Sequence, residues 1–443
     1  MSTALVSPLL RSLQEGEVFR PSMPASLREA GLNEPLAESL VCKTLLSVGE
    51  ESGRGIAKRL CLPFGALEKT LHHLRSQQMI VHAGAAPLND VYYTLTETGR
   101  ERARSMARAC AYVGPAPVPL DDYILSVEAQ TIRAEAPQRA RLEKAFEGIS
   151  IDPTVIDCLG PAINSGAGLF LYGAPGNGKS TIAKRITRCF GHYIWIPRVL
   201  LDDGQFIKLF DEACHKPRRV DDDALLSRQS EFDPRWVQIR RPTVVVGGEL
   251  TMDNLEIRHD ERANVCEAPL QLKSNCGCFL IDDFGRQRIE PRELLNRWII
   301  PLENRMDFLT LPTGKKIQVP FDQLIIFSTN LDPTQLADEA FLRRIPYKVE
   351  VGDPSEAEFQ QLFELYARQH RCAYRRDAVE YLLETHYRPH HRPLRRCQPR
   401  DLLSQVANLC RYNGLPMEMR EDYFDRVARS YFTAIQRPRS GDV

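Results

Sequence analysis

The chain has 443 residues, which is enough for two to four domains of ordinary size. Apolar residues make up 43% and charged residues 26%, a composition typical of a globular protein and not of a disordered one. Lys and Arg balance Asp and Glu at 58 each, so no overall field favours nucleic acid or acidic membranes, and binding of that kind requires a local patch.

Cysteine usage and hydropathy indicate the cellular compartment in which the protein resides. The twelve cysteines are scattered and never form a CxxC pair, which is typical of reduced thiols in the cytosol. The first residues, MSTALVSPLLRSLQ, lack the basic start and the apolar stretch of a signal peptide. No apolar run has the length that spans a bilayer. We therefore expect a cytoplasmic protein without membrane insertion.

The first elements in the chain predict a small domain. Residues 1–34 are weakly patterned, and we expect them to be weakly ordered. Residues 35–112 then read as three helices, two short strands around a loop, and a last helix, because their apolar positions follow helical and then alternating spacing. That order is typical of a winged helix-turn-helix.

This domain has two possible roles. Its third helix would present Lys69 and His72 opposite an apolar face, and Arg54 and Lys58 on the preceding helix could meet phosphates. Charge within the domain is nearly balanced, however, and winged helices also dock proteins. Both contact with DNA and contact with a partner stay open.

A proline-rich segment, 113–123, is predicted to be a stiff extended linker, since it holds three prolines within five residues. Residues 124–352 alternate apolar runs with helical patterns, which predicts an α/β core with a mostly parallel sheet. The best core strands are 168–172, 243–246, 277–281 and 324–328. Residues 353–443 are predicted to be helical, starting at a capping box formed by Ser355 and Glu358.

A phosphate-binding loop follows the first core strand. The motif GxxxxGK[ST] is matched in full, between an apolar strand and an amphipathic helix, by Gly173, Ala174, Pro175, Gly176, Asn177, Gly178, Lys179 and Ser180, with Thr181 next. Glycines let backbone N–H groups curl around an anion, and the helix N-terminus adds positive charge. Lys179 is expected to neutralise the β and γ phosphates of ATP, and the Ser180 hydroxyl to ligate Mg²⁺.

Polar residues end two further core strands. Asp282 follows an apolar strand, where a carboxylate that orders Mg²⁺ belongs, and Asp283 is positioned to polarise the attacking water. Asn330 follows the strand LIIFST and is expected to orient that water. The sequence therefore predicts an ATP-hydrolysing site with ATP and Mg²⁺ bound.

Arginines in the last third of the chain complete the predicted site. Arg343 and Arg344 lie between apolar residues, where one of them could reach the γ phosphate of a neighbouring subunit as an arginine finger. Arg400 lies in the first turn of a helix in the C-terminal region, from which it could reach the nucleotide.

These residues, taken together, resemble an AAA+ ATPase from about 140 to 437. The resemblance matches Walker A at 173–180, Walker B at 279–283, sensor 1 at Asn330 and sensor 2 at Arg400. It implies a P-loop αβα core, a helical lid and a ring, commonly a hexamer, with ATP at subunit interfaces. Residues 307–321 look like the hairpin that precedes sensor 1 in the magnesium chelatase, MoxR and enhancer-binding activator group.

The whole chain also resembles bacterial ATPases with chaperone activity that are associated with Flp pilus assembly. This resemblance implies an ATPase that remodels a protein partner. The alternative is an ATP-regulated DNA-binding regulator or loader that acts through the winged helix. One departure concerns Asp283, where many AAA+ proteins have Glu. Asp is one methylene shorter, and a non-hydrolysing ATP switch is the third interpretation.

Overall fold

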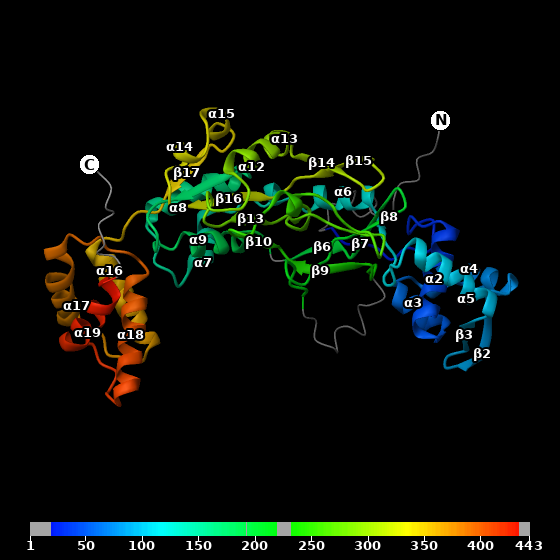
Figure 1. Cartoon of the computed structure of the whole chain (residues 1–443), viewed down its shortest axis with the longest axis horizontal. Coiled ribbons are helices and arrows are strands. Elements are labelled where there is room, and N and C mark those ends of the chain that lie inside the picture. Colours follow the sequence, from blue (N-terminus) through cyan, green and yellow to red (C-terminus); the bar gives the residue numbers. More distant parts are fainter. Residues whose placement is uncertain (1–18, 192, 219–231, 434–443) are drawn as a thin grey trace.

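A computed structural model of the chain describes residues 19–191, 193–218 and 232–433. Figure 1 shows an elongated arch with a helical unit at each end and the larger sheets between them. The N-terminal unit lies at one end of the long axis and the C-terminal bundle at the other. The predicted α/β fold with a parallel sheet is confirmed.

Helices and a small antiparallel sheet form the N-terminal unit. Side chains cap three of its helices, since Asn33, Ser52 and Thr96 each accept a hydrogen bond from a backbone N–H in the first turn. Its elements are α2 (Glu34–Val48), β1 (Glu50–Ser52), α3 (Gly53–Leu60), α4 (Phe64–Ser76), β2 (Ile80–Ala86), β3 (Asp90–Leu95) and α5 (Glu97–Ala109). The sheet order is β1-β3-β2.

Residues 19–33 differ from the weak order that the sequence predicts for 1–34. Leu27, Ala30 and Leu32 are buried in the N-terminal core, and the ring of Phe19 packs 5.7 Å from that of Trp236. Apolar side chains too widely spaced to form a helical pattern are thus ordered by partners far along the chain. Residues 1–18 lie outside the described residues.

The predicted stiff linker, 113–123, is extended at its centre and helical at its end, and Ala116, Val118 and Leu120 within it are buried. Val118 and Pro119 form β4 (Val118–Pro119), a parallel edge strand beside β7 (Val199–Asp202). Proline is tolerated on an edge because its missing N–H faces no partner strand. Helix α6 (Leu120–Ala129) begins at once, and Tyr123 is buried. The N-terminal unit is thereby held against the central part.

Five parallel strands form the main sheet, in the order β10-β13-β16-β5-β17. The first four are the strands that the sequence predicts, and the last was not foreseen. Their bounds are β5 (Leu169–Tyr172), β10 (Thr243–Val246), β13 (Cys278–Ile281), β16 (Leu324–Thr329) and β17 (Tyr347–Glu350). Strand β16 lies between β13 and β5, so the carboxyl ends of these three strands lie side by side.

Helices cover both faces of this sheet. Leu169 and Leu171 pack in one apolar cluster with α7, α8 and α9, and Phe170 packs in another with α12. Such double burial explains why the central strands β5, β13 and β16 are almost entirely apolar. The helices are α7 (Arg139–Phe146), α8 (Pro153–Ser165), α9 (Lys179–Ile186), α12 (Pro291–Arg297), α13 (Ile299–Asn304), α14 (Pro333–Leu336) and α15 (Glu339–Leu342).

A second group of strands lies between α9 and β13 in the chain, apart from β4, which precedes α9. One sheet has the order β11-β12-β8-β7-β4, and β6 pairs with β9 in an antiparallel ribbon. The β7–β8 hairpin turns at Asp203 and Gly204, as Asp-Asp-Gly predicts. The elements are β6 (Tyr193–Pro197), β8 (Gln205–Lys208), β9 (Trp236–Arg240), β11 (Arg258–Asp260), β12 (Val265–Glu267) and α11 (Leu270–Lys273).

Helices form the C-terminal bundle, which has a core of its own. The predicted capping box of Ser355 and Glu358 is present at its first helix. Its helices are α16 (Glu356–Gln369), α17 (Arg376–Leu382), α18 (Gln398–Asn413) and α19 (Glu421–Thr433). Across all the described residues, none of the helices combines the length and the apolar character that a membrane span requires.

Candidate functional site

The loop 173–178 connects the carboxyl end of β5 to the first turn of α9. Gly173, Gly176 and Gly178 have φ of 133°, 86° and 88°, values that side chains rarely adopt. Close neighbours also exclude a side chain at two of them. A Cβ on Gly173 would lie 2.5 Å from the Val351 carbonyl oxygen, and one on Gly176 would lie 2.6 Å from Cys397 Sγ.

Lys179 opens α9 and is buried, with 6% of its surface exposed. Its Nζ donates to the carbonyls of Gly173 and Ala174, both at 2.9 Å, and to Asn330 Oδ1 at 2.7 Å. These three acceptors offset the cost of removing an ammonium group from water. Lys179 thus joins the loop to the end of β16.

The groups around Lys179 shift its pKa in opposite directions. Burial lowers the pKa of Lys179, and the carboxylates of Asp283 and Asp282 counteract that shift. Arg395 lowers the pKa of Lys179 further, which places a second cation near the loop. Among the neighbouring positions, Pro175 and Thr181 are exposed, whereas Asn177 is buried.

A hydroxyl and a carboxylate meet beside the loop. Ser180 Oγ donates to Asp282 Oδ1 at 2.8 Å, so the first helical turn is joined to the end of β13. Hydroxyl and carboxylate oxygens are hard metal ligands, and Mg²⁺ prefers such oxygen ligands while keeping several waters. This pair therefore fits a magnesium ion that a nucleotide would bring.

Asp283 and Asn330 extend the same network. Asn330 Nδ2 donates to Asp283 Oδ1 at 3.2 Å, while its Oδ1 accepts from Lys179. Asp283 is exposed and has φ of 51°, in the left-handed region that Asp tolerates. Gln287 Nε2 donates to the carbonyls of Asp282 and Asp283 and holds this turn. The structure thus brings together the predicted residues at the ends of three strands.

The C-terminal bundle reaches the loop through a segment whose role the sequence did not reveal. Cys397 N donates to the Gly176 carbonyl at 2.9 Å, and Arg396 N donates to Asn177 Oδ1 at 3.3 Å. Asn177 Nδ2 in turn donates to Asp353 Oδ1 at 2.6 Å, which also pairs with Arg395. The only signal in the sequence was the density of arginines before α18.

The predicted arginines occupy different environments. Arg344 forms an ion pair with Glu303 at 2.6 Å, whereas Arg343, at the end of α15, is exposed. Arg400, in the first turn of α18, pairs with the adjacent Asp401, and 58% of its side chain is exposed. Arg395 is the lid arginine that influences Lys179.

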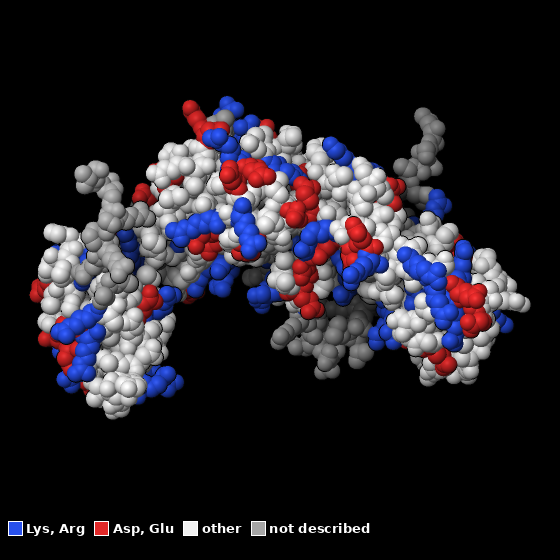
Figure 2. Space-filling view, in the orientation of Figure 1, with Lys and Arg blue, Asp and Glu red and all other residues white. Residues whose placement is uncertain are grey.

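The predicted contact residues of the N-terminal unit are all exposed. Lys69 and His72 lie on α4, and Lys58 lies on α3. Arg54 begins α3, where its guanidinium lies 5.6 Å from the centre of the Phe64 ring and its N–H donates to Asp90. Figure 2 shows acidic and basic side chains intermixed on this unit.

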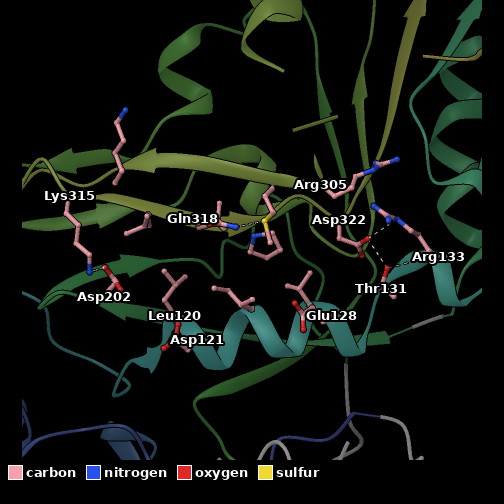
Figure 3. A pocket seen from close by; sticks show the side chains of 17 residues that line it. Leu120, Asp121, Glu128, Thr131, Arg133, Asp202, Arg305, Lys315, Gln318 and Asp322 are labelled. Carbon is pink, nitrogen blue, oxygen red and sulfur yellow. Dashed lines mark hydrogen bonds and ion pairs between the residues drawn. The ribbon is translucent and has the colours of Figure 1, made fainter. Parts of the chain in front are cut away.

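The hairpin predicted at 307–321 is present as β14 (Met306–Thr310) and β15 (Lys316–Pro320). A cavity of about 650 Å³ separates it from α6, with Arg133 and Asp322 at one end and Lys315 with Asp202 at the other (Figure 3). Both ends are closed by ion pairs, of 3.8 Å and 2.8 Å. No residue of the loop 173–180 lines this cavity, so it is separate from the site described above.

Comparisons with known proteins match parts of the chain. Residues 355–430, the C-terminal bundle, match a domain of unknown function, DUF8689. No curated protein matches the chain. Among solved structures, NtrX from Brucella abortus is 16% identical with a TM-score of 0.39, and the match covers 67% of this chain and 58% of NtrX.

Two other solved structures show the same level of likeness. NtrX from Brucella abortus in complex with ADP is 17% identical with a TM-score of 0.40, over 78% of this chain and 69% of that one. A BchI–BchD complex of magnesium chelatase is 17% identical with a TM-score of 0.35, over 66% of this chain and 95% of that one. At this distance the likeness carries no argument about activity.

Proposed function

We propose that this chain is an AAA+ ATPase that binds Mg-ATP at residues 173–180 and hydrolyses it to ADP and phosphate. One observation carries the proposal: a continuous chain of hydrogen bonds joins Lys179, Asn330 and Asp283, and Ser180 bonds to Asp282 beside it. These are the groups that phosphate binding, water positioning and magnesium binding require, at the carboxyl edge of one parallel sheet.

Each side chain then has a chemical role. Lys179 donates to the phosphates and offsets their negative charge, while Asn330 and Asp283 hold the attacking water between them and Asp283 accepts its proton. Ser180 and Asp282 would hold Mg²⁺, which supplies charge neutralisation at the β and γ phosphates. To bind the nucleotide, Lys179 has to exchange its carbonyl acceptors for phosphate oxygens. Burial lowers the pKa of Lys179, and the negative charge of the phosphates would raise that pKa again.

Steady-state phosphate release tests the proposal. We expect the purified protein to release phosphate from ATP in the presence of Mg²⁺, and Lys179→Ala to lose on the order of 100-fold or more of that rate. Lys58→Ala, an exposed lysine of the N-terminal unit, is the matched control and retains the rate. Equal rates for wild type and Lys179→Ala would show that the assignment is wrong.

We further propose that ATP binds at the interface between subunits of a ring, in the hexameric arrangement common among AAA+ proteins. Arg343 is the better candidate for the arginine finger, because it is exposed while Arg344 is held by Glu303 within its own chain. Hydrolysis would move the C-terminal lid, since Cys397 and Arg396 bond directly to the loop at Gly176 and Asn177.

The work done by this motion is proposed to be remodelling of a protein partner, in the manner of a chaperone for pilus or secretion assembly. The proposed winged helix-turn-helix, 35–112, would dock that partner. Affinity capture with an ATP-trapped Asp283→Asn variant tests this role. A protein that is retained with ATP and released with ADP supports remodelling. Retention that is the same with ATP and with ADP contradicts the remodelling role.

A second candidate is an ATP-regulated DNA-binding regulator or loader. Exposure of Lys69 and His72 on the third helix favours it, since that helix is the one that would enter a major groove. Gel-shift titration of duplex DNA across salt concentrations discriminates between the two. Affinity that falls steeply with salt and is lost in Lys69→Ala supports this candidate, and absence of binding at low salt removes it.

A further inference from the structure

A second large cavity lies at the opposite edge of the main sheet from the ATP site. It has a volume of about 800 Å³ and lies among α7, the end of α9, the start of β10 and the β6–β9 ribbon. Figure 1 shows α7 and α9 on one side of the sheet close to β10. Helix α9 runs from Lys179 in the ATP site toward Lys184, which lines this cavity.

The charge of this cavity contrasts with the neutral charge of the whole chain. Its described lining residues include seven Lys and Arg and no Asp or Glu. Six of these cations are exposed to solvent: Arg141, Lys144, Lys184, Arg188, Lys216 and Arg240. Figure 2 shows basic side chains on the concave underside of the arch, between the C-terminal bundle and the central part. Clustered like charges repel one another, so an anion that bridges them would be bound.

A buried arginine forms part of the wall of the cavity. The side chain of Arg241 is only 6% exposed, and its two terminal nitrogens are held by the carbonyls of Gln130 and Cys276 and by Glu135. Its Nε has no hydrogen-bond partner among the described residues. Arg241 is thus held in place in the wall of the cavity by groups of its own chain.

An aromatic ring completes the cavity. Tyr193 lines it with 37% of its surface exposed, and Arg218 lies 5.0 Å from the centre of its ring. Backbone pairing fixes this arrangement, because Tyr193 pairs with Arg240 and the Arg240 N–H donates to the Lys216 carbonyl at 2.9 Å. The ribbon and the segment that pairs beside it therefore place the Tyr193 ring near Lys216, Arg218 and Arg240.

We infer that this cavity, termed the basic groove, binds single-stranded nucleic acid. Spaced cations that follow a phosphate backbone, combined with an aromatic ring that stacks on a base, are the two elements of such sites. An acidic peptide would use the cations but gain little from the ring. The N-terminal unit has intermixed charges, so the basic groove is a better candidate than α4 for contact with a phosphate backbone.

Fluorescence anisotropy with labelled oligo-dT and oligo-U of about 20 nucleotides tests this inference, since one such groove covers roughly 4–16 nucleotides. We expect the full-length protein to bind both probes at low salt, with affinity that falls as salt rises. Failure to bind either probe at low salt would overturn the inference.

A triple substitution locates the site. Lys184→Gln, Arg188→Gln and Lys216→Gln together remove three phosphate contacts, so the slope of log affinity against log salt should become shallower by about 2. Arg54→Gln, Lys58→Gln and Lys69→Gln is the matched control, with the same loss of charge on the N-terminal unit. Loss of binding in the control but not in the groove variant would place the site on the N-terminal unit and contradict the inference. Thermal unfolding verifies that both variants are folded.

Tyr193 distinguishes nucleic acid from other polyanions. Tyr193→Ala should weaken oligo-dT binding by roughly 5- to 150-fold, and Tyr193→Phe, which keeps the ring, should bind like the wild type. Polyglutamate is the competitor. If polyglutamate displaces oligo-dT at equal charge concentration and Tyr193→Ala changes nothing, the groove binds acidic polypeptides and the inference is wrong.

Discussion

The two edges of the main sheet differ in how their charges are held. At the carboxyl edge, Lys179, Asn330 and Asp283 are joined by direct side-chain hydrogen bonds, and opposite charges face one another. At the amino edge, exposed cations surround a groove whose described lining residues include no Asp or Glu. The first arrangement is preorganised for one compact anion and its metal. The second suits a longer anion that supplies the missing negative charge itself.

The largest expected effect concerns the residue that would complete the carboxyl edge from a neighbouring subunit. Arg343→Ala should lower the rate of ATP hydrolysis by about 1,000- to 100,000-fold, the range for arginine fingers. Arg344→Ala should cost much less, because Arg344 pairs with Glu303 in its own chain. Phosphate release by the two variants measures this difference, and a larger loss in Arg344→Ala would reverse the assignment.

Removing the charge of Asp283 separates hydrolysis from binding at the same edge. Asp283→Asn should lose roughly 100- to 10,000-fold in hydrolysis, as expected when a general base is removed. ATP binding should persist, since Lys179, Ser180 and Asp282 remain. Equilibrium binding of a fluorescent ATP analogue, measured beside the turnover rate, tests the prediction. Loss of both together would mean that Asp283 organises the site instead of acting on water.

The two edges also differ in how far their residues can be predicted from the sequence. The loop 173–180 is contiguous, and Asp282 and Asn330 directly follow apolar strands, so local patterns were enough to predict them. The cations of the basic groove are spread from Arg141 to Arg241 and meet only because α7, α9 and the β6–β9 ribbon are packed together. No local pattern indicates such a cluster, and the balanced total charge conceals it.

Two parts of the fold were equally hidden, for the same reason. The proline-rich segment has the composition of a linker, but Val118 finds a pairing partner in Leu200, about eighty residues further along the chain. The contact between Gly176 and Cys397 joins residues more than two hundred positions apart. Long-range pairing of this kind depends on the folded neighbours and leaves no periodic signal.

Arginines of the lid offer a finer test of the carboxyl edge. Arg395→Ala should weaken ATP binding roughly tenfold, because a charge-assisted contact near the phosphates is lost along with the Asp353 pair. Arg400→Ala, at the position that the sequence favours, should change binding less, since that side chain is exposed and pairs with Asp401. Titration of both variants with the fluorescent ATP analogue measures the two losses of affinity. A larger loss in Arg400→Ala than in Arg395→Ala would favour Arg400 as the sensor 2 residue.

The last expected effect is on stability and comes from the loop itself. Gly176→Ala should lower the free energy of unfolding by about 1–3 kcal/mol, since φ of 86° strains a side chain and its Cβ would meet Cys397 Sγ. Gly65→Ala, at an exposed helical position with no atom within 4 Å, is the matched control. Thermal unfolding compares the two variants. Equal stability would indicate that Cys397 does not pack closely against the loop at Gly176.

Single-turnover conversion of labelled ATP to ADP tests the central claim most directly. With protein in excess over ATP, we expect complete conversion in the presence of Mg²⁺, strong slowing when Mg²⁺ is chelated, and no conversion above background in Lys179→Ala. ATP that stays bound and unconverted through a long incubation of the wild-type protein would contradict hydrolysis at this site and leave a nucleotide-binding switch.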